Sequence, residues 1–196
     1  MLLSICIPTF NRLNCLNNCL NSIIISSKNV KFDFEVCISD NFSQGNINII
    51  INNYKNKLNI NYTRNKKNLG HGKNFLQAVS MAKGEFVWTL GNDDLLLPDT
   101  LKKLHNIILL NKDVDFFFIN SFNLDSKEVF KFSQPFDTKK LPAEMKKYSE
   151  EKVSRKLKFF DLINPKISFD FLMGMYLLVF KKKNWKENIN VVDEKL

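Results

Sequence analysis

Two adjacent carboxylates lie near the middle of the chain, directly after an apolar run. Asp93 and Asp94 follow Phe86, Val87 and Leu90, so both are expected at the end of a buried strand. Neighbouring carboxylates repel one another, and a cation between them removes much of that cost. Mg²⁺ and Mn²⁺ take oxygen ligands and commonly bridge one or two carboxylates to substrate phosphates. The pair therefore predicts a site for a divalent metal and a phosphorylated ligand, with a polar turn capped by an Asp as the alternative.

Polar residues also follow the two earliest apolar runs of the chain. Asp40 closes the second run, where a carboxylate can accept hydrogen bonds from a base N–H or a ribose hydroxyl. The segment 8–12 offers backbone amides, an amide side chain and the Arg12 guanidinium, which suit a nucleotide and its phosphates. The alternatives are an Asx turn or helix cap at Asp40 and a turn capped by Thr9 or Asn11.

A basic loop with two glycines precedes a predicted helix. Residues 65–72 combine two lysines and His71 with these glycines and lead into Lys73 and Asn74 at the helix start. Flexible backbone with positive charge suits a diphosphate, and a solvated loop is the alternative. His105, the other histidine, falls on a helix and not at ligand spacing, so a histidine-based metal site is not expected.

Several other catalytic motifs are missing from the sequence. No Gly-x-Gly-x-x-Gly follows the first apolar run and no Gly-x-x-x-x-Gly-Lys-Ser/Thr occurs, which disfavours dinucleotide oxidoreductases and P-loop NTPases. No Gly-x-Ser-x-Gly nucleophile elbow occurs either. The phenylalanines fall in strand and helix patterns rather than in an RNA-binding motif, so nucleic acid is not an expected partner.

Strand and helix patterns alternate along the first 120 residues. The strands are predicted at 2–7, 34–39, 58–63, 85–90 and 114–120, and the helices at 13–24, 47–54, 73–82 and 98–108. Such alternation implies right-handed crossovers and a mainly parallel sheet covered on both faces, that is, an α/β fold. Ligands of such sheets bind beyond the carboxyl ends of the strands. The loops beginning at Pro8, Asp40, Arg64 and Gly91 are therefore expected to share one cleft.

Regularity weakens after residue 120. Residues 128–132 suggest another strand, residues 139–160 suggest a partly helical lysine-rich segment, and residues 173–180 are apolar. No internal repeat and no long linker is visible, so one domain is expected.

The composition indicates the compartment and the kind of partner to expect. The 196 residues carry 29 basic and 20 acidic side chains, a formal charge of +9, which suits an anionic partner or is simply a solvated basic face. The four cysteines form no Cys-x-x-Cys pair and are expected to be reduced, which favours the cytosol. Neither a secretory signal nor a run of the ~20 apolar residues that span a bilayer is expected.

Four strings of residues together resemble the family-2 glycosyltransferases in order and spacing. They are residues 4–12, 37–43, 64–70 and 82–94, and the resemblance covers about residues 1–120. It implies a GT-A fold, a nucleotide-sugar donor, Mn²⁺ or Mg²⁺, and transfer with inversion at the anomeric carbon. It also implies a donor-binding core at 1–120 and an acceptor-side region of the same domain at 121–196.

The resemblance assigns roles by position in this sequence. Those near the donor nucleotide would be Pro8, Thr9, Asn11, Arg12, Asp40 at the base, Asn68, Gly70, Lys73 and Asn74. At the catalytic centre, Asp93 would reach the ribose or diphosphate and Asp94 would ligate the metal. Asn92 stands where the family's acidic motif often has its first Asp.

Inversion requires a general base that deprotonates the acceptor hydroxyl. In the family it is usually an acidic residue well downstream of the metal motif, and the sequence is expected to stop just before it. Asp170 and Asp193 are the weak candidates within the chain, with an ordinary surface or capping Asp as the alternative at each.

The expected function is sugar transfer to a saccharide or lipid-linked acceptor in the assembly of a surface polysaccharide: capsule, lipopolysaccharide or lipooligosaccharide. One alternative is a nucleotide-sugar-binding protein that lacks its base. Another is a nucleotidyltransferase, although the usual glycine-rich basic loop after the first strand is missing. The lysine-rich residues 139–158 suggest contact with an anionic membrane, which would place a cytoplasmic protein at the inner face of the cell membrane.

Overall fold

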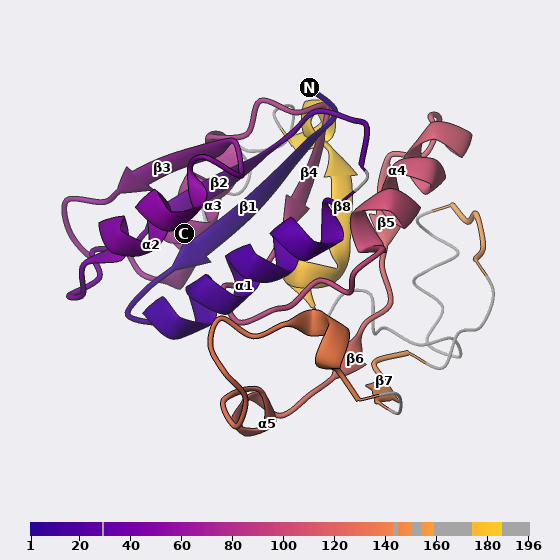
Figure 1. The fold of residues 1–196 in the computed structure, drawn as a ribbon. Helices are drawn as coiled ribbons and strands as arrows, with labels where there is room; N and C mark the ends of the chain where they lie inside the picture. The colour runs from indigo at the N-terminus through magenta and orange to yellow at the C-terminus, as the bar shows by residue number, and fades with distance from the viewer. Residues whose placement is uncertain (29, 143–144, 150–153, 159–173, 186–196) are drawn as a thin grey trace.

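The computed structural model describes residues 1–28, 30–142, 145–149, 154–158 and 174–185. Within them, a six-stranded sheet has the order β3-β2-β1-β4-β8-β5 (Figure 1). Its strands are β1 (Leu3–Thr9), β2 (Phe34–Asp40), β3 (Ile60–Arg64), β4 (Phe86–Thr89), β5 (Phe116–Phe118) and β8 (Leu178–Lys181). The pairs β1–β2, β1–β4 and β2–β3 are parallel, which confirms the predicted α/β fold with a mainly parallel sheet.

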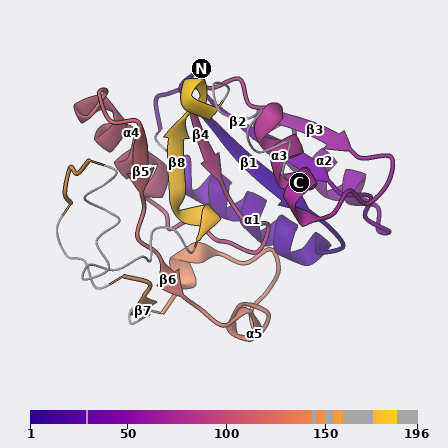
Figure 2. The same ribbon diagram turned by 180° about the vertical axis from the view of Figure 1, so that it is seen from behind.

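Helices cover both faces of this sheet. They are α1 (Leu13–Ser26), α2 (Ile47–Tyr54), α3 (His71–Ser80) and α4 (Thr100–Leu110). Side chains of α1, α2 and α4 pack in one core cluster, and those of α3 pack in a second cluster on the opposite face (Figures 1 and 2). Strand alternation explains the division, because Ile5 and Ile7 of β1 enter the first cluster and Cys6 enters the second.

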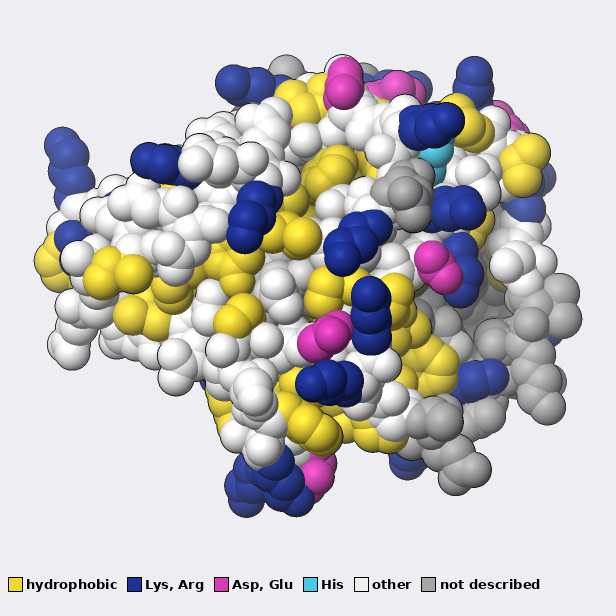
Figure 3. Space-filling view, in the orientation of Figure 1, with side chains coloured by type: hydrophobic (Ala, Val, Ile, Leu, Met, Phe, Trp, Pro, Cys, Tyr) yellow, Lys and Arg dark blue, Asp and Glu magenta, His cyan; other side chains and the backbone are white. Residues whose placement is uncertain are grey.

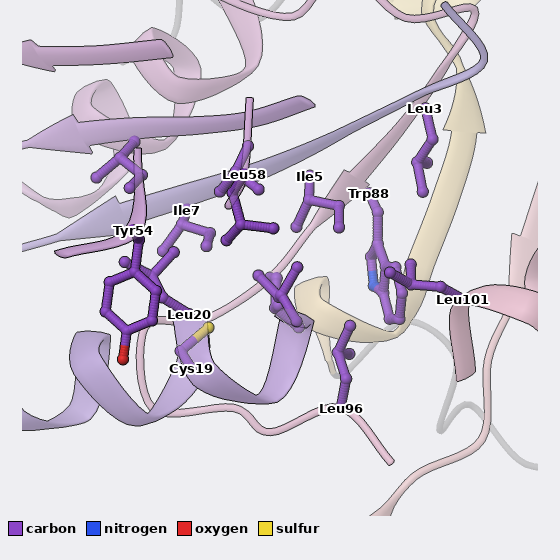
Figure 4. Close-up of a cluster of buried hydrophobic side chains, with 14 of the residues drawn as sticks. Leu3, Ile5, Ile7, Cys19, Leu20, Tyr54, Leu58, Trp88, Leu96 and Leu101 are labelled. Carbon is purple, nitrogen blue, oxygen red and sulfur yellow. The ribbon is translucent and has the colours of Figure 1, made fainter. Parts of the chain in front are cut away.

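The first cluster fixes the carboxyl end of β1 over α1. Leu16, Leu20 and Ile23 recur at helical spacing on α1, and all three are fully buried. Ile7 lies beside Leu20 in Figure 4, and Ile5 belongs to the same cluster. The packing of β1 against α1 thus sets the position of the loop between them.

The last strand has a position that the sequence pattern does not reveal. The apolar run predicted at 173–180 supplies η2 (Met175–Leu177) and then β8, which pairs antiparallel with both β4 and β5. The indole Nε1 of Trp88 donates to the Tyr176 carbonyl at 2.7 Å and fixes this return next to β4.

Residues 121–142 and 145–149 form an irregular layer beside the sheet. It contains β6 (Phe122–Asn123), α5 (Ser126–Val129), η1 (Thr138–Lys140) and β7 (Lys146–Lys147), with β6 and β7 paired antiparallel. The strand predicted at 128–132 is wrong. The Asp125 side chain accepts a hydrogen bond from the Lys127 N–H at 2.8 Å, and this local cap begins α5 instead.

Contacts with α1 hold this layer in place. The buried Phe136 donates its N–H to Asn18 Oδ1 at 2.8 Å and accepts at its carbonyl from Asn21 Nδ2 at 2.8 Å. In the described part of residues 139–160, helical structure is confined to Lys139 and Lys140 at the end of η1. Over the described ranges, no helix combines the length and apolar character needed to cross a bilayer.

Candidate active site

Four loops meet at the carboxyl edge of the sheet, as predicted. Two backbone hydrogen bonds continue past the strand ends, from Asn41 N–H to the Thr9 carbonyl and from Asn65 N–H to the Asp40 carbonyl, both 2.8 Å. The loops after β1 and β2 are also joined, because Asn11 N–H donates to Ser43 Oγ at 2.9 Å. Residues far apart in sequence therefore face one another at this edge.

The loops after β1 and β4 are joined by an ion pair. Arg12 Nη1 contacts Asp93 Oδ2, and the two side chains remain 58% and 48% exposed. A ligand at this edge can reach both charges, since neither is buried. The ion pair places a guanidinium and a carboxylate where an anionic group and a cation could bind together.

Asp94 lies deeper in the same loop. Its Oδ2 accepts from the Gly91 N–H at 2.8 Å, and burial raises the pKa of the carboxyl from 3.8 to about 7, against the opposing effect of that hydrogen bond. A Cβ on Gly91 would lie 2.6 Å from Asp94 Oδ2, so a larger residue here would displace the carboxylate. Asp94 is therefore held toward the loop backbone.

Asp40 is fully buried at the end of β2 and is already engaged within the protein. Its Oδ1 accepts from Ser43 N–H at 3.0 Å, and its Oδ2 lies 3.4 Å from both the Tyr62 hydroxyl and Arg64 Nε. Burial and the neighbouring Asp40 charge raise the pKa of Tyr62 to about 12. Direct contact between Asp40 and a ligand would require one of these partners to move.

A buried amide network positions the loop after β3. Asn41 donates through Nδ2 to Asn68 Oδ1 at 2.7 Å and accepts at Oδ1 from Leu69 N–H at 2.8 Å. Asn74, which the sequence places near the nucleotide, is buried, and its Oδ1 accepts from Asn65 Nδ2 at 2.9 Å. The network holds the loop down against the end of β2.

The remaining predicted residues divide between the strand and the helix start. Pro8 lies within β1, opposite Ser39 of β2, so the loop begins after Thr9. Gly70 has φ +83° at the N-cap of α3, a conformation that glycine adopts freely. Lys73 is exposed in the first turn of α3, which begins at His71 rather than at the predicted residue 73.

A pocket of about 260 Å³ lies beside the carboxylate pair. Asp93 and Asp94 line one end, and the rest of the wall is mainly apolar, with Leu97, Ile119, Leu124 and Leu141 among its residues. The described residues of the loops after β2 and β3 do not line it. Of the four loops that were expected to share one cleft, only the loop after β4 lines this pocket, and the other loops are joined to it along the sheet edge.

Comparison with known proteins decides the family. The sequence pattern that defines the family described as "Glycosyl transferase family 2" matches residues 4–181 of this chain. This chain belongs to glycosyl transferase family 2. The resemblance seen in the four strings of the sequence is confirmed.

Two relatives that are named for their activities match part of the chain. The abequosyltransferase RfbV of Salmonella typhimurium is 42% identical over 116 residues, which is 58% of this chain and 34% of that protein. The poly(ribitol-phosphate) β-N-acetylglucosaminyltransferase TarS of Staphylococcus aureus is 34% identical over 103 residues, 52% of this chain and 18% of that protein. The chain therefore spans about a third or less of the length of these two relatives.

Solved structures agree with the fold. The structure of Staphylococcus aureus TarS 1-349 in complex with UDP-GlcNAc matches with a TM-score of 0.68 at 23% identity, over 96% of this chain and 48% of that one. At this identity the match shows the GT-A fold that the family resemblance implies.

Asn92 is the residue at which this chain departs from the acidic motif named above, since an asparagine stands where the motif often has its first aspartate. The residue is 7% exposed, and its Nδ2 donates to Thr9 Oγ1 at 2.8 Å. Asn92 thus ties the end of β4 to the end of β1, with its side chain directed into the protein. Thr9, another predicted site residue, is buried by the same contact.

The carboxylates fit a cation that is shared with a ligand. Within the described ranges, no group of three or more His, Cys, Asp and Glu side chains is placed to hold a metal by itself. Mg²⁺ is commonly bound by one or two carboxylates together with substrate phosphates and water. Asp93 and Asp94 match that smaller donor set.

Two predicted residues are not tested by the structure, and two residues without a predicted role take part in the site. The weak base candidates Asp170 and Asp193 lie outside the described residues. Sequence reasoning also missed the parts that Asn41 and Tyr62 take in the site, as partners of Asn68 and Asp40. The position of Asn41, directly after Asp40 at a strand end, is the signal that could have identified it.

Proposed function

We propose that this chain transfers a sugar from a nucleotide-diphosphate-sugar donor to a saccharide or lipid-linked acceptor in the assembly of a surface polysaccharide. The observation that carries the proposal is the joining of Arg12 to Asp93 at the sheet edge, beside Asp94 and an open pocket. The names of the relatives support it, because both describe glycosyltransferases. Family membership supports it as well.

On the donor side, Arg12 would contact the diphosphate through its guanidinium. Asp93, freed from Arg12, would reach the ribose or the diphosphate. Asn41 and Asn74 would act indirectly, because their buried amides hold the loop that carries Asn68 and Gly70. The rigid network would keep that loop in a binding conformation before the donor arrives.

Mn²⁺ or Mg²⁺ would bind Asp94, with Asp93 beside it, and would neutralise the negative charge that develops on the departing nucleotide diphosphate. Without a cation, Arg12 balances Asp93 and the Gly91 N–H contacts Asp94. The protein residues therefore bind and orient the donor at the edge of the sheet.

On the acceptor side, the pocket beside the carboxylates would admit the acceptor. Inversion requires a carboxylate to remove the acceptor proton, and Asp170 and Asp193 are the candidates that this chain offers. Tyr176 lines the same pocket, and burial raises the pKa of its phenol, so it would stay neutral and could donate a hydrogen bond to the acceptor.

A lipid-linked acceptor would bring the protein to the cytoplasmic face of a membrane. Three phenylalanines and six lysines after β5 are exposed, and we term them the aromatic-lysine surface: Phe122, Phe130, Phe132, Lys127, Lys131, Lys139, Lys140, Lys146 and Lys147. The phenylalanines are 40–45% exposed, and Phe122 and Phe130 also line the pocket. Where α5 lies, Figure 3 shows basic and hydrophobic side chains side by side. Such mixtures suit the headgroup region of an anionic membrane.

Calorimetric titration tests the donor assignment. UDP, CDP and GDP are each titrated with Mn²⁺ into the wild type and into Asp94→Asn, with Asp33→Asn, an exposed carboxylate at the amino end of β2, as the matched control. We expect a nucleoside diphosphate to bind in the presence of Mn²⁺, and the metal dependence to be lost in Asp94→Asn alone. Binding that is absent, or indifferent to Asp94, would refute the proposal.

A further inference from the structure

Phe42 combines a left-handed backbone with an exposed aromatic ring. Its φ is +70°, and the residue is 46% exposed at the start of the loop after β2. A side chain with a Cβ is disfavoured in this region, whereas glycine is not. A ring that stays in solvent recovers little hydrophobic stabilisation. A costly conformation in a residue whose ring stays half exposed marks a candidate ligand contact.

Arg64 supports one side of this ring. The guanidinium carbon Cζ lies 4.7 Å from the ring centroid of Phe42. Arg64 is itself fixed, because Nη2 donates to the Ser43 carbonyl at 2.8 Å and Nε lies 3.4 Å from the buried carboxylate of Asp40. The ring therefore rests on a planar cation that the protein holds in place.

The loop that carries Phe42 belongs to the same sheet edge as Asp93. The Gln44 N–H donates to Asn11 Oδ1 at 2.8 Å, and the next residue, Arg12, pairs with Asp93. Phe42 follows β2 and Asp93 follows β4, with β1 between them. Adjacent strands lie about 4.8 Å apart, so the two strand ends are separated by roughly 10 Å, the scale of an extended nucleoside diphosphate.

Resting on the proposed function, we infer that the ring of Phe42, backed by Arg64, is the surface on which the nucleobase of the donor stacks. The base, the phenyl ring and the guanidinium form a layered stack, and the diphosphate extends toward Arg12 and Asp93. Stacking accepts any base, because every base has an aromatic face. Phe42 therefore contributes affinity for the nucleoside, separately from the groups that bind the diphosphate.

Two substitutions separate the ring from the backbone conformation. Phe42→Ala and Phe42→Gly both remove the ring, but only glycine adopts the positive φ without a Cβ. We expect Phe42→Gly to unfold about 2–4 °C above Phe42→Ala. Both variants should bind the best nucleoside diphosphate with Mn²⁺ about 5- to 100-fold more weakly than the wild type. If Phe42 only stabilised the fold, Phe42→Ala would bind the nucleoside diphosphate more weakly than Phe42→Gly, in step with its lower unfolding temperature.

Pyrophosphate with Mn²⁺ is the matched probe, because it lacks the base. Its affinity should be unchanged in both variants. In Phe42→Trp the aromatic face is kept, so nucleoside diphosphate binding should persist, and the indole fluorescence added by the substitution should be quenched by the nucleoside diphosphate and not by pyrophosphate.

The two proposals can fail separately. Unchanged nucleoside diphosphate affinity in Phe42→Gly, with pyrophosphate bound normally, would overturn the stacking assignment alone. Equal losses for pyrophosphate and nucleoside diphosphate would also overturn it, because they would show a general disturbance of the loop. Failure of the wild type to bind any nucleoside diphosphate would overturn the proposed function and the stacking assignment together.

Discussion

Arg12 and Asp93, 81 residues apart in sequence, form an ion pair that joins the loop after β1 to the loop after β4. Both side chains are about half exposed, and ion pairs of this kind contribute little to folding, about 0–1 kcal/mol. The role of the Arg12–Asp93 pair is instead to position the two charges. Before any ligand arrives, the pair holds a cation and an anion at the edge where a nucleotide diphosphate and its metal are proposed to bind.

Replacement of Arg12 should affect binding far more than stability. In Arg12→Gln the diphosphate would lose a charge-assisted hydrogen bond, so we expect affinity for a nucleoside diphosphate with Mn²⁺ to fall by about tenfold or more. The unfolding temperature should change by less than about 2 °C. Calorimetry and thermal unfolding measure the two effects. Lys28→Gln, an exposed residue after α1, removes the same charge elsewhere and should leave affinity intact; similar losses in both variants would contradict this role.

An aspartate introduced at position 92 should make folding stability depend on metal. Asn92 is buried and donates to Thr9, and an ionised Asp there would place a third carboxylate beside Asp93 and Asp94. We expect Asn92→Asp to lower the free energy of unfolding in EDTA by about 1–3 kcal/mol. Mn²⁺ should then raise its unfolding temperature more than that of the wild type, because a ligand of the folded state stabilises it. A Mn²⁺ effect equal in the two proteins would argue against a cation at this turn.

The raised pKa of Asp94 predicts that the folding stability of the metal-free protein depends on pH. Its pKa is raised from 3.8 to about 7, so between these values the folded state binds more protons than the unfolded chain. Stability contributed by Asp94 is therefore present at low pH, is lost as pH rises toward about 7, and does not change further above it. Asp94→Asn cannot titrate. The wild-type free energy of unfolding minus that of the variant, from urea titrations in EDTA, should fall between about pH 4 and pH 7. A difference that stays constant with pH would show that Asp94 titrates near its ordinary value.

Binding to lipid vesicles should depend on the aromatic-lysine surface. We expect the wild type to co-sediment with vesicles of phosphatidylcholine and phosphatidylglycerol, and salt to weaken the association. Phe130→Ala with Phe132→Ala should reduce it, because both rings are 44–45% exposed.

The control for vesicle binding removes exposed apolar side chains elsewhere. Ile107→Ala with Leu110→Ala on α4 should leave co-sedimentation unchanged, although Leu110 is 83% exposed. Equal binding to vesicles of phosphatidylcholine alone, or equal losses in the two double variants, would exclude a specific membrane-facing surface.

Much of the fold could be predicted from local patterns. Alternating apolar residues place β1 and β2 within a residue or two of their observed bounds, and helical spacing does the same for α1 and α4. These signals work because side-chain direction follows backbone geometry over a few residues. The prediction was wrong at 128–132, where the Asp125 cap outweighs a weak strand pattern, and it could not place β8, whose partners β4 and β5 are distant in sequence.

The candidate site shows the same division. The turn chemistry of residues 91–94 and the loop positions could be predicted, because turn-forming residues act on their neighbours. The partners could not. The sequence predicts that Asp40 contacts a base or a ribose, but in the structure Asp40 is fully buried, and Tyr62 and Arg64 contact it. Phe42 received no role from the sequence, because its backbone conformation is visible only in the folded chain.

The sequence by itself determined the order of strands and helices in the first 120 residues, the family and the edge of the sheet where the polar loops gather. Tertiary structure decided which of those polar residues face a ligand and which face the protein: Arg12 and Asp93 are accessible, whereas Asn74 and Asn92 are buried in hydrogen bonds. The physical reason is one of range. Backbone propensity and alternation act between neighbours, but burial and pairing depend on packing between segments that only the complete fold brings together.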